Sequence, residues 1–101
     1  MYVRSGTYVG TGAVQGVTGL GFAPKIVFIK GGANTCVVKT DSMPTSSVKE
    51  ISQAAALVTN AITAFTSDGF TLGTDNHANN SGTTYFWLAL GDNGGADLET
   101  G

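Results

Sequence analysis

A chain of 101 residues is long enough for one domain with its own core and too short for two. Hydrophobic residues make up 42% of it and charged residues 12%, which excludes a disordered chain, while 15 glycines beside two prolines indicate many turns rather than a collagen-like repeat. The formal net charge is −2 and the five basic residues lie singly within residues 1–49, so the basic patch typical of nucleic-acid binding is absent. These observations predict a small all-β domain that does not bind nucleic acid.

Glycine-bounded strands are predicted through the first half of the chain. Gly6–Gly10 is one short strand, and a weak second strand spans Val14–Val17. The segment Lys25–Lys30 is apolar on both faces, which predicts a central strand buried in the core. It forms a hairpin with Thr35–Thr40 across the turn Gly31–Asn34.

The next segments are less regular. The polar stretch Asp41–Glu50 predicts an exposed loop, and Ile51–Asn60 fits either one short helix or an irregular strand. Ala61–Phe65 and Phe70–Gly73 are predicted to form a second hairpin. Its turn, Ser67–Gly69, holds an Asp-Gly pair suited to positive φ.

The longest predicted strand is Thr83–Leu90. Tyr85 and Trp87 share one face of it, and Phe86 and Leu88 share the other. Two apolar faces require burial on both sides, or a partner chain that covers one of them. The whole chain, residues 1–101, is therefore predicted to be a single antiparallel β-sandwich or jelly-roll-like domain of about seven or eight short strands.

Two sets of residues are candidates for contacts with a partner. Tyr85 and Trp87 are aromatic types enriched at interfaces, with ordinary core packing as the alternative. The end segments 1–5 and 96–101 are predicted to be extended arms that add an edge strand to a neighbour. The candidate interface to other copies or to another protein is therefore Tyr2, Val3, Arg4, Tyr85, Trp87 and Leu98.

The polar loop Thr74–Gly82 contains the only histidine. Asp75 and His77 have the residue types of a base and its orienter, but catalysis also needs a placed nucleophile and an oxyanion donor. We therefore predict a surface-contact loop, with a plain solvated loop as the alternative, and no catalytic residue. The contact residues are Asp75, Asn76, His77, Asn79 and Asn80.

Metal and cofactor chemistry is not expected. One cysteine excludes a disulfide within the chain, and with one histidine it leaves too few ligands for a structural zinc site built on these residue types. The spacing of the glycines in Gly10–Gly16 does not match the dinucleotide fingerprint, so this segment is predicted to be a turn. No cofactor is predicted.

The order of turn glycines and apolar residues resembles a β-rich module of tailed-phage virion proteins. The residues that carry the resemblance are Gly6–Gly12, Val17–Lys30, Ile62–Asp75 and Gly82–Leu90. It implies a non-enzymatic virion structural protein, and no catalytic residues belong to the pattern. We expect a capsid decoration protein that binds and stabilises the outer capsid surface. The alternative is a tail-fibre or virion-surface module that binds a receptor or glycan.

The resemblance also sets the expected partners and location. The partner would be the major capsid protein or another virion protein, and the chain would form a homo-oligomer, with a trimer favoured. Met1–Arg4 has no signal-peptide pattern, and the apolar run Tyr85–Leu90 is far shorter than a membrane span. The protein is therefore expected to be made in the host cytoplasm, to carry no membrane segment, and to reside in the virion.

Overall fold

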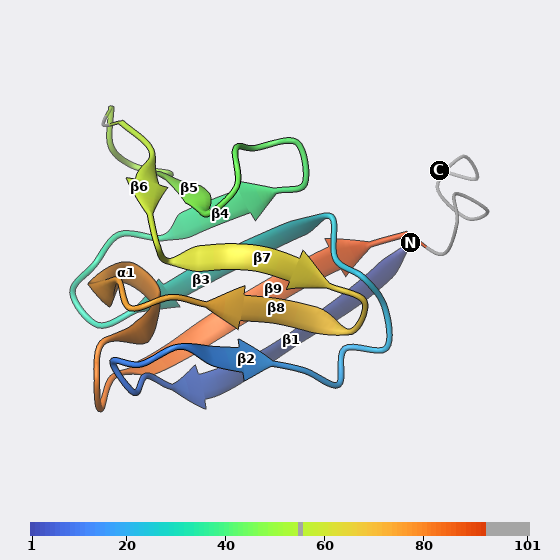
Figure 1. Cartoon of the computed structure of the whole chain (residues 1–101), viewed down its shortest axis with the longest axis horizontal. Coiled ribbons are helices and arrows are strands. Elements are labelled where there is room, and N and C mark those ends of the chain that lie inside the picture. The colour runs from blue at the N-terminus through green and yellow to red at the C-terminus, as the bar shows by residue number, and fades with distance from the viewer. Residues whose placement is uncertain (55, 93–101) are drawn as a thin grey trace.

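Two antiparallel sheets lie face to face in the computed structural model, which describes residues 1–54 and 56–92 (Figure 1). The larger sheet has six strands in the order β1-β9-β3-β4-β5-β6, and the smaller has three in the order β2-β8-β7. The elements are β1 (Tyr2–Val9), β2 (Gln15–Val17), β3 (Ile26–Gly31), β4 (Val37–Thr40), β5 (Ser47–Glu50), β6 (Val58–Thr59), β7 (Ile62–Thr66), β8 (Gly69–Leu72), α1 (Asn76–Asn79) and β9 (Thr84–Gly91). The predicted all-β class is confirmed, with nine strands in the described residues.

The core lies between the two sheets. Inward-facing side chains of β3, β4 and β9 meet those of β7 and β8, and alternation along each strand sends every second residue into this layer. Trp87 packs edge-on against Phe70, with 5.6 Å between ring centroids. Burying each large apolar side chain contributes about 1.5–3 kcal/mol. The strand residues of this core are Val27, Ile29, Val37, Val48, Ile62, Phe70, Leu72, Tyr85, Trp87 and Ala89.

The first and last described strands are neighbours. All of β1 pairs with β9, from Tyr2 opposite Gly91 to Val9 opposite Thr84. Residues 2–5, expected as an extended arm, are therefore the first half of an ordinary sheet strand. The second expected arm, residues 96–101, lies outside the described residues.

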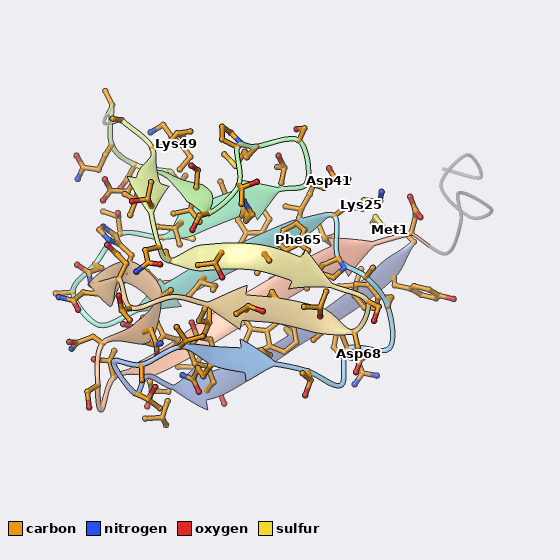
Figure 2. All side chains as sticks on the ribbon, viewed as in Figure 1. Met1, Lys25, Asp41, Lys49, Phe65 and Asp68 are labelled. Carbon is orange, nitrogen blue, oxygen red and sulfur yellow. The ribbon has the colours of Figure 1, made fainter. Side chains whose placement is uncertain are left out.

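The segment between β4 and β7 differs from its prediction. The expected loop at Asp41–Glu50 ends in a strand, β5, because Val48 is fully buried and its backbone pairs with β6. Ile51–Asn60 contributes no helix among its described residues and only the short strand β6. Directly after β4, the Asp41 carboxylate forms an ion pair with Lys25, which precedes β3 (Nζ–Oδ2 3.2 Å; Figure 2).

Candidate functional site

The side of the six-stranded sheet that faces away from the core is rich in exposed apolar side chains. We call it the outer face. Phe86 is 61% exposed and Leu88 38% exposed, although both lie on β9, which has a paired strand on each side. The strand residues whose side chains form the outer face are Val3, Ser5, Thr7, Val9, Ile26, Phe28, Lys30, Val38, Thr40, Lys49, Thr84, Phe86, Leu88 and Leu90.

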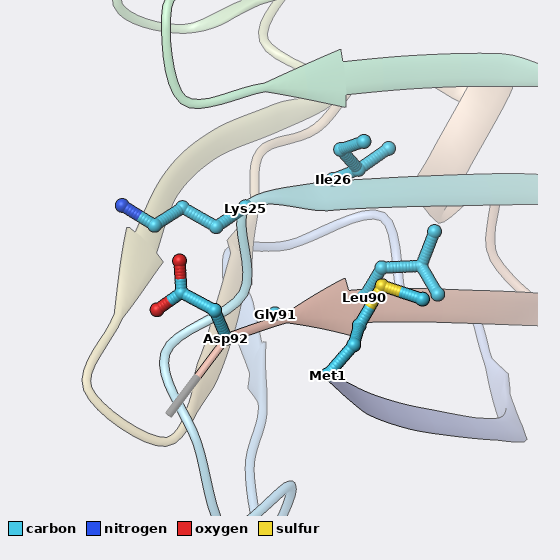
Figure 3. Close-up of a pocket in the computed structure, with 6 residues that line it drawn as sticks. All are labelled: Met1, Lys25, Ile26, Leu90, Gly91 and Asp92. Carbon is cyan, nitrogen blue, oxygen red and sulfur yellow. The ribbon is translucent and has the colours of Figure 1, made fainter. Parts of the chain in front are cut away.

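The strand register makes the apolar part of the outer face continuous. Leu90 lies between Val3 of β1 and Ile26 of β3, and Leu88 lies opposite Phe28. Figure 3 shows Ile26 and Leu90 projecting from adjacent strands, with the Met1 side chain against Leu90. These residues border a shallow hollow of about 150 Å³ at one end of the face.

The charges on the outer face have one sign. Lys30 and Lys49 point outward, and none of the outward-facing residues on the described strands is acidic. The Lys30 ammonium donates to the Gly32 carbonyl (2.9 Å), and the Lys49 ammonium donates to the Glu50 carbonyl (2.8 Å). The charged strand residues of the outer face are therefore both basic, on a chain whose net charge is −2.

Two aromatic residues proposed for the interface lie in the core instead. Tyr85 is fully buried and Trp87 is 8% exposed, because their face of β9 is the one turned toward the smaller sheet. The Tyr85 hydroxyl donates to the Asn76 carbonyl (2.7 Å) and accepts from the Asn80 N–H (2.8 Å). The partner-facing candidates on this strand are Phe86 and Leu88.

The N-terminal candidates are divided between the two sides of β1. Val3 belongs to the outer face, where it is 57% exposed. Tyr2 and Arg4 point to the other side and line a hollow of about 280 Å³ with Phe22, whose ring centroid lies 5.4 Å from that of Tyr2. The remaining candidate, Leu98, lies outside the described residues.

The polar loop contains a buried asparagine rather than a fully exposed contact surface. Asn79 has no exposed area, and its side chain makes four hydrogen bonds. Its amide nitrogen donates to the carbonyls of Ala13 (2.6 Å) and Gly73 (2.7 Å), and its amide oxygen accepts from Thr11 N–H and Gln15 Nε2 (both 2.8 Å). Asn79 thus satisfies backbone groups of two loops. Its predicted role as a surface contact is wrong.

His77 lies between two carboxylates. Its Nδ1 is 2.7 Å from Asp75 Oδ1 and its Nε2 is 2.7 Å from Glu50 Oε1. The same Glu50 oxygen accepts a hydrogen bond from the Thr35 hydroxyl (2.9 Å). The cluster therefore ties the loop around α1 to β5. Sequence reasoning paired His77 with Asp75 but missed Glu50, which is far away along the chain.

The two carboxylates change the protonation of the cluster. Burial opposes the charge on the imidazole, but the hydrogen bonds and charges of Asp75 and Glu50 outweigh it and raise the pKa of His77. The hydrogen bond from Thr35, followed by that from His77, lowers the pKa of Glu50. Both ring nitrogens of His77 are engaged by carboxylates, so neither is left to accept a proton from a substrate in this arrangement.

The cluster predicts a pH-dependent contribution to stability. A raised pKa of His77 makes this contribution full below its ordinary value of 6.5 and causes its loss as pH rises through the folded-state pKa. The contribution of Glu50 is present above its ordinary value of 4.5 and is lost as pH falls through the lowered folded-state pKa. The cluster therefore stabilises the fold most between about pH 4.5 and 6.5.

His77→Gln tests this expectation. Urea unfolding of the wild-type protein and the variant at pH 5.5 and 8.5 gives the free energy of unfolding of each. We expect the variant to be less stable than wild type at pH 5.5 and the difference between them to be smaller at pH 8.5. Other titrating groups, such as Asp68, are present in both proteins and cancel in the comparison. A gap that is equal at the two pH values would mean that His77 contributes through packing alone.

A buried lysine lies on the inward side of β4. Lys39 is 5% exposed, and its ammonium donates to the carbonyls of Pro44 (3.2 Å) and Ser47 (3.1 Å). Its Nζ is 6.0 Å from the centre of the Phe65 ring. Burial lowers the pKa of Lys39. The side chain fastens the turn between β4 and β5 to the sheet, and no sequence signal distinguished it from the other lysines.

These features define a small β-sandwich whose most distinctive surface is an exposed apolar sheet face. Residues 1–100 match the family described as a domain of unknown function (DUF7483), and the chain belongs to this family. No curated protein and no solved structure matches the chain. No group of three or more His, Cys, Asp or Glu side chains in the described residues is arranged to hold a metal ion. Within those residues, no helix has the length and hydropathy to cross a membrane.

Proposed function

We propose that this protein is a non-enzymatic structural component of a tailed-phage particle, a decoration protein that binds the outer capsid surface. The resemblance to virion modules supports a location in the phage particle, and the outer face supports binding to another protein through an exposed apolar surface. The observation that carries the proposal is Phe86, which is 61% exposed in the middle of a sheet. Contiguous exposed apolar surface of this kind is typical of protein-binding sites.

The size and charge of the outer face fit a protein partner. The strands β1, β9, β3 and β4 have 8, 8, 6 and 4 residues, and at about 3.3 Å per residue and about 4.8 Å between strands they have a flat footprint of roughly 400 Å². Standard interfaces bury about 800 Å² of accessible surface on each partner, and projecting side chains add to the flat area. Lys30 and Lys49 favour a capsid surface that is apolar at its centre and acidic at its edge.

Substitutions on β9 test the proposal. Phe86→Thr and Leu88→Thr remove exposed apolar groups while keeping residues that favour strands. We expect each to weaken binding to capsids assembled from the major capsid protein of the same phage by about tenfold to a hundredfold. Co-sedimentation measures the affinity. Val14→Thr is the matched control, because Val14 is an apolar residue that is 69% exposed but lies in the loop before β2, outside the outer face.

Two results would contradict this function. If wild-type protein does not sediment with the capsids, the capsid is not its partner. If the β9 variants bind capsids as well as wild type does, the outer face is not the binding surface. Glycan binding in a glycan array, without affinity for capsids, would instead favour the tail-fibre or receptor-binding alternative.

A further inference from the structure

Among the described residues, β1 is an edge strand of the six-stranded sheet. The described sheet begins at β1, which pairs with β9 on one side and has no strand on the other. The Gly10 N–H donates to the Thr83 carbonyl (2.8 Å) in the same register, so alternate residues from Tyr2 to Tyr8 bond to β9. The backbone N–H and C=O groups of Val3, Ser5, Thr7 and Val9 therefore point away from the sheet.

Edge strands of natural sheets are normally protected against pairing. Charged residues, proline, bulges or shortness provide this protection. The four positions of β1 with open backbone groups are valine, serine, threonine and valine, the strand spans eight residues, and its only charged residue, Arg4, points to the other side. Within the described part of the chain, the Val9 carbonyl accepts a hydrogen bond from Gln15 Nε2 (3.2 Å), and a carbonyl oxygen can accept a second one.

The edge is complementary to itself. If a second β1 runs antiparallel with Gly6 opposite Gly6, Val3 meets Val9 of the other copy and Ser5 meets Thr7, so each outward position pairs with a residue of the same kind. Every such pair then exchanges two backbone hydrogen bonds. Gly6 adds no side chain at the two-fold axis, where a Cβ would lie 2.9 Å from the Trp87 ring of its own chain.

We propose that β1 pairs with β1 of a second copy of this chain, forming a two-fold dimer with one continuous sheet. The occupant is a second copy because the sequence of outward positions reads alike in both directions. The dimer places two outer faces side by side, which doubles the surface offered to a partner. This proposed two-fold pair differs from the trimer favoured under the resemblance.

Ser5→Pro tests the pairing. Proline removes an N–H that points to the open edge and leaves the hydrogen bonds to β9 intact. Sedimentation velocity should show wild-type protein as a dimer and the proline variant dissociating at a concentration at least tenfold higher than wild type. Ser5→Thr is the matched control and should remain dimeric. A wild-type monomer at every concentration, or a dimeric proline variant, would overturn the proposal.

Cross-linking tests the register even if the proline variant fails to fold. In a Cys36→Ser background, Ser5→Cys combined with Thr7→Cys should give a disulfide-linked dimer on oxidation, because the two positions face each other across the axis. Each single cysteine variant should cross-link at least tenfold less. Efficient cross-linking by Ser5→Cys or Thr7→Cys alone would contradict the Gly6-centred register.

The experiments distinguish a wrong dimer proposal from a wrong proposed function. Phe86→Thr should leave the dimer intact while it weakens capsid binding. Loss of the dimer in Phe86→Thr, with Ser5→Pro still dimeric, would assign self-association to the outer face and contradict pairing through β1. Capsid binding by a wild-type monomer would leave the proposed function standing and overturn the dimer.

Discussion

Replacing Asn79 with aspartate is expected to destabilise the protein by about 3–5 kcal/mol at pH 7. The side-chain amide nitrogen donates to two carbonyl oxygens, those of Ala13 at 2.6 Å and Gly73 at 2.7 Å. A carboxylate oxygen in its place cannot donate, so three oxygens with negative charge or partial charge would face one another in a site without solvent. Native domains are stable by only about 5–15 kcal/mol, so this loss is a large share.

Urea unfolding measures the effect. Asn80→Asp is the control, because Asn80 is exposed and its side chain makes one surface hydrogen bond, to Thr83 (3.0 Å). We expect a change within about 1 kcal/mol for the control. Lowering the pH should reduce the loss of unfolding free energy in Asn79→Asp, because a protonated carboxyl group can again donate one hydrogen bond. A loss below about 1 kcal/mol at pH 7 would show that the two loops do not depend on this residue.

Replacing Gly69 with alanine is expected to cost about 3 kcal/mol and to separate β2 from β8. A Cβ at this position would lie 1.8 Å from the Val17 carbonyl oxygen and 2.9 Å from its carbon. Both are backbone atoms, so no rotamer change relieves the clash, and the ladder between the strands must open. Val17 pairs with Phe70 in this ladder.

Gly16→Ala is the matched control within the same ladder. A Cβ there would meet only ordinary contacts, 3.9 Å from the Phe70 carbonyl oxygen and 4.0 Å from Thr18 Cγ2. Alanine restricts the unfolded chain more than glycine does, so we expect a gain of about 0.4–1 kcal/mol. Thermal or urea unfolding compares the two variants. Equal effects at both positions would show that glycine is needed for backbone freedom rather than for close packing.

The role of Gly69 also shows where a local pattern was misread. The Asp68-Gly69 pair predicted a turn glycine with positive φ, but Gly69 begins β8 and is not among the described glycines in the left-handed region. Asp68 instead accepts hydrogen bonds from the N–H groups of Gly21 (2.7 Å) and Gly19 (2.9 Å), which lower its pKa. Gly19 and Gly21, which both have positive φ, lie in the loop that Asp68 holds.

The candidate sites were harder to predict than the strands. His77 and Asp75 are neighbours in the sequence, so their pairing was visible, whereas Glu50 reaches His77 only through the fold. Asn79 appears in the sequence as one more polar residue of a polar loop. Its burial depends on carbonyls supplied by two loops, one of them far along the chain, that the strands bring around it.

Sequence alone determined the all-β class and the positions of the main strands, because the apolar residues of a strand and the glycines of the turns beside it are local features of the sequence. The predicted strands Lys25–Lys30 and Thr83–Leu90 each lie within one residue of β3 and β9. Tertiary structure alone decided which side of β9 faces the core. An alternating strand with two apolar faces is unchanged in pattern when it is turned over, and only the position of the smaller sheet buries Tyr85 and exposes Phe86.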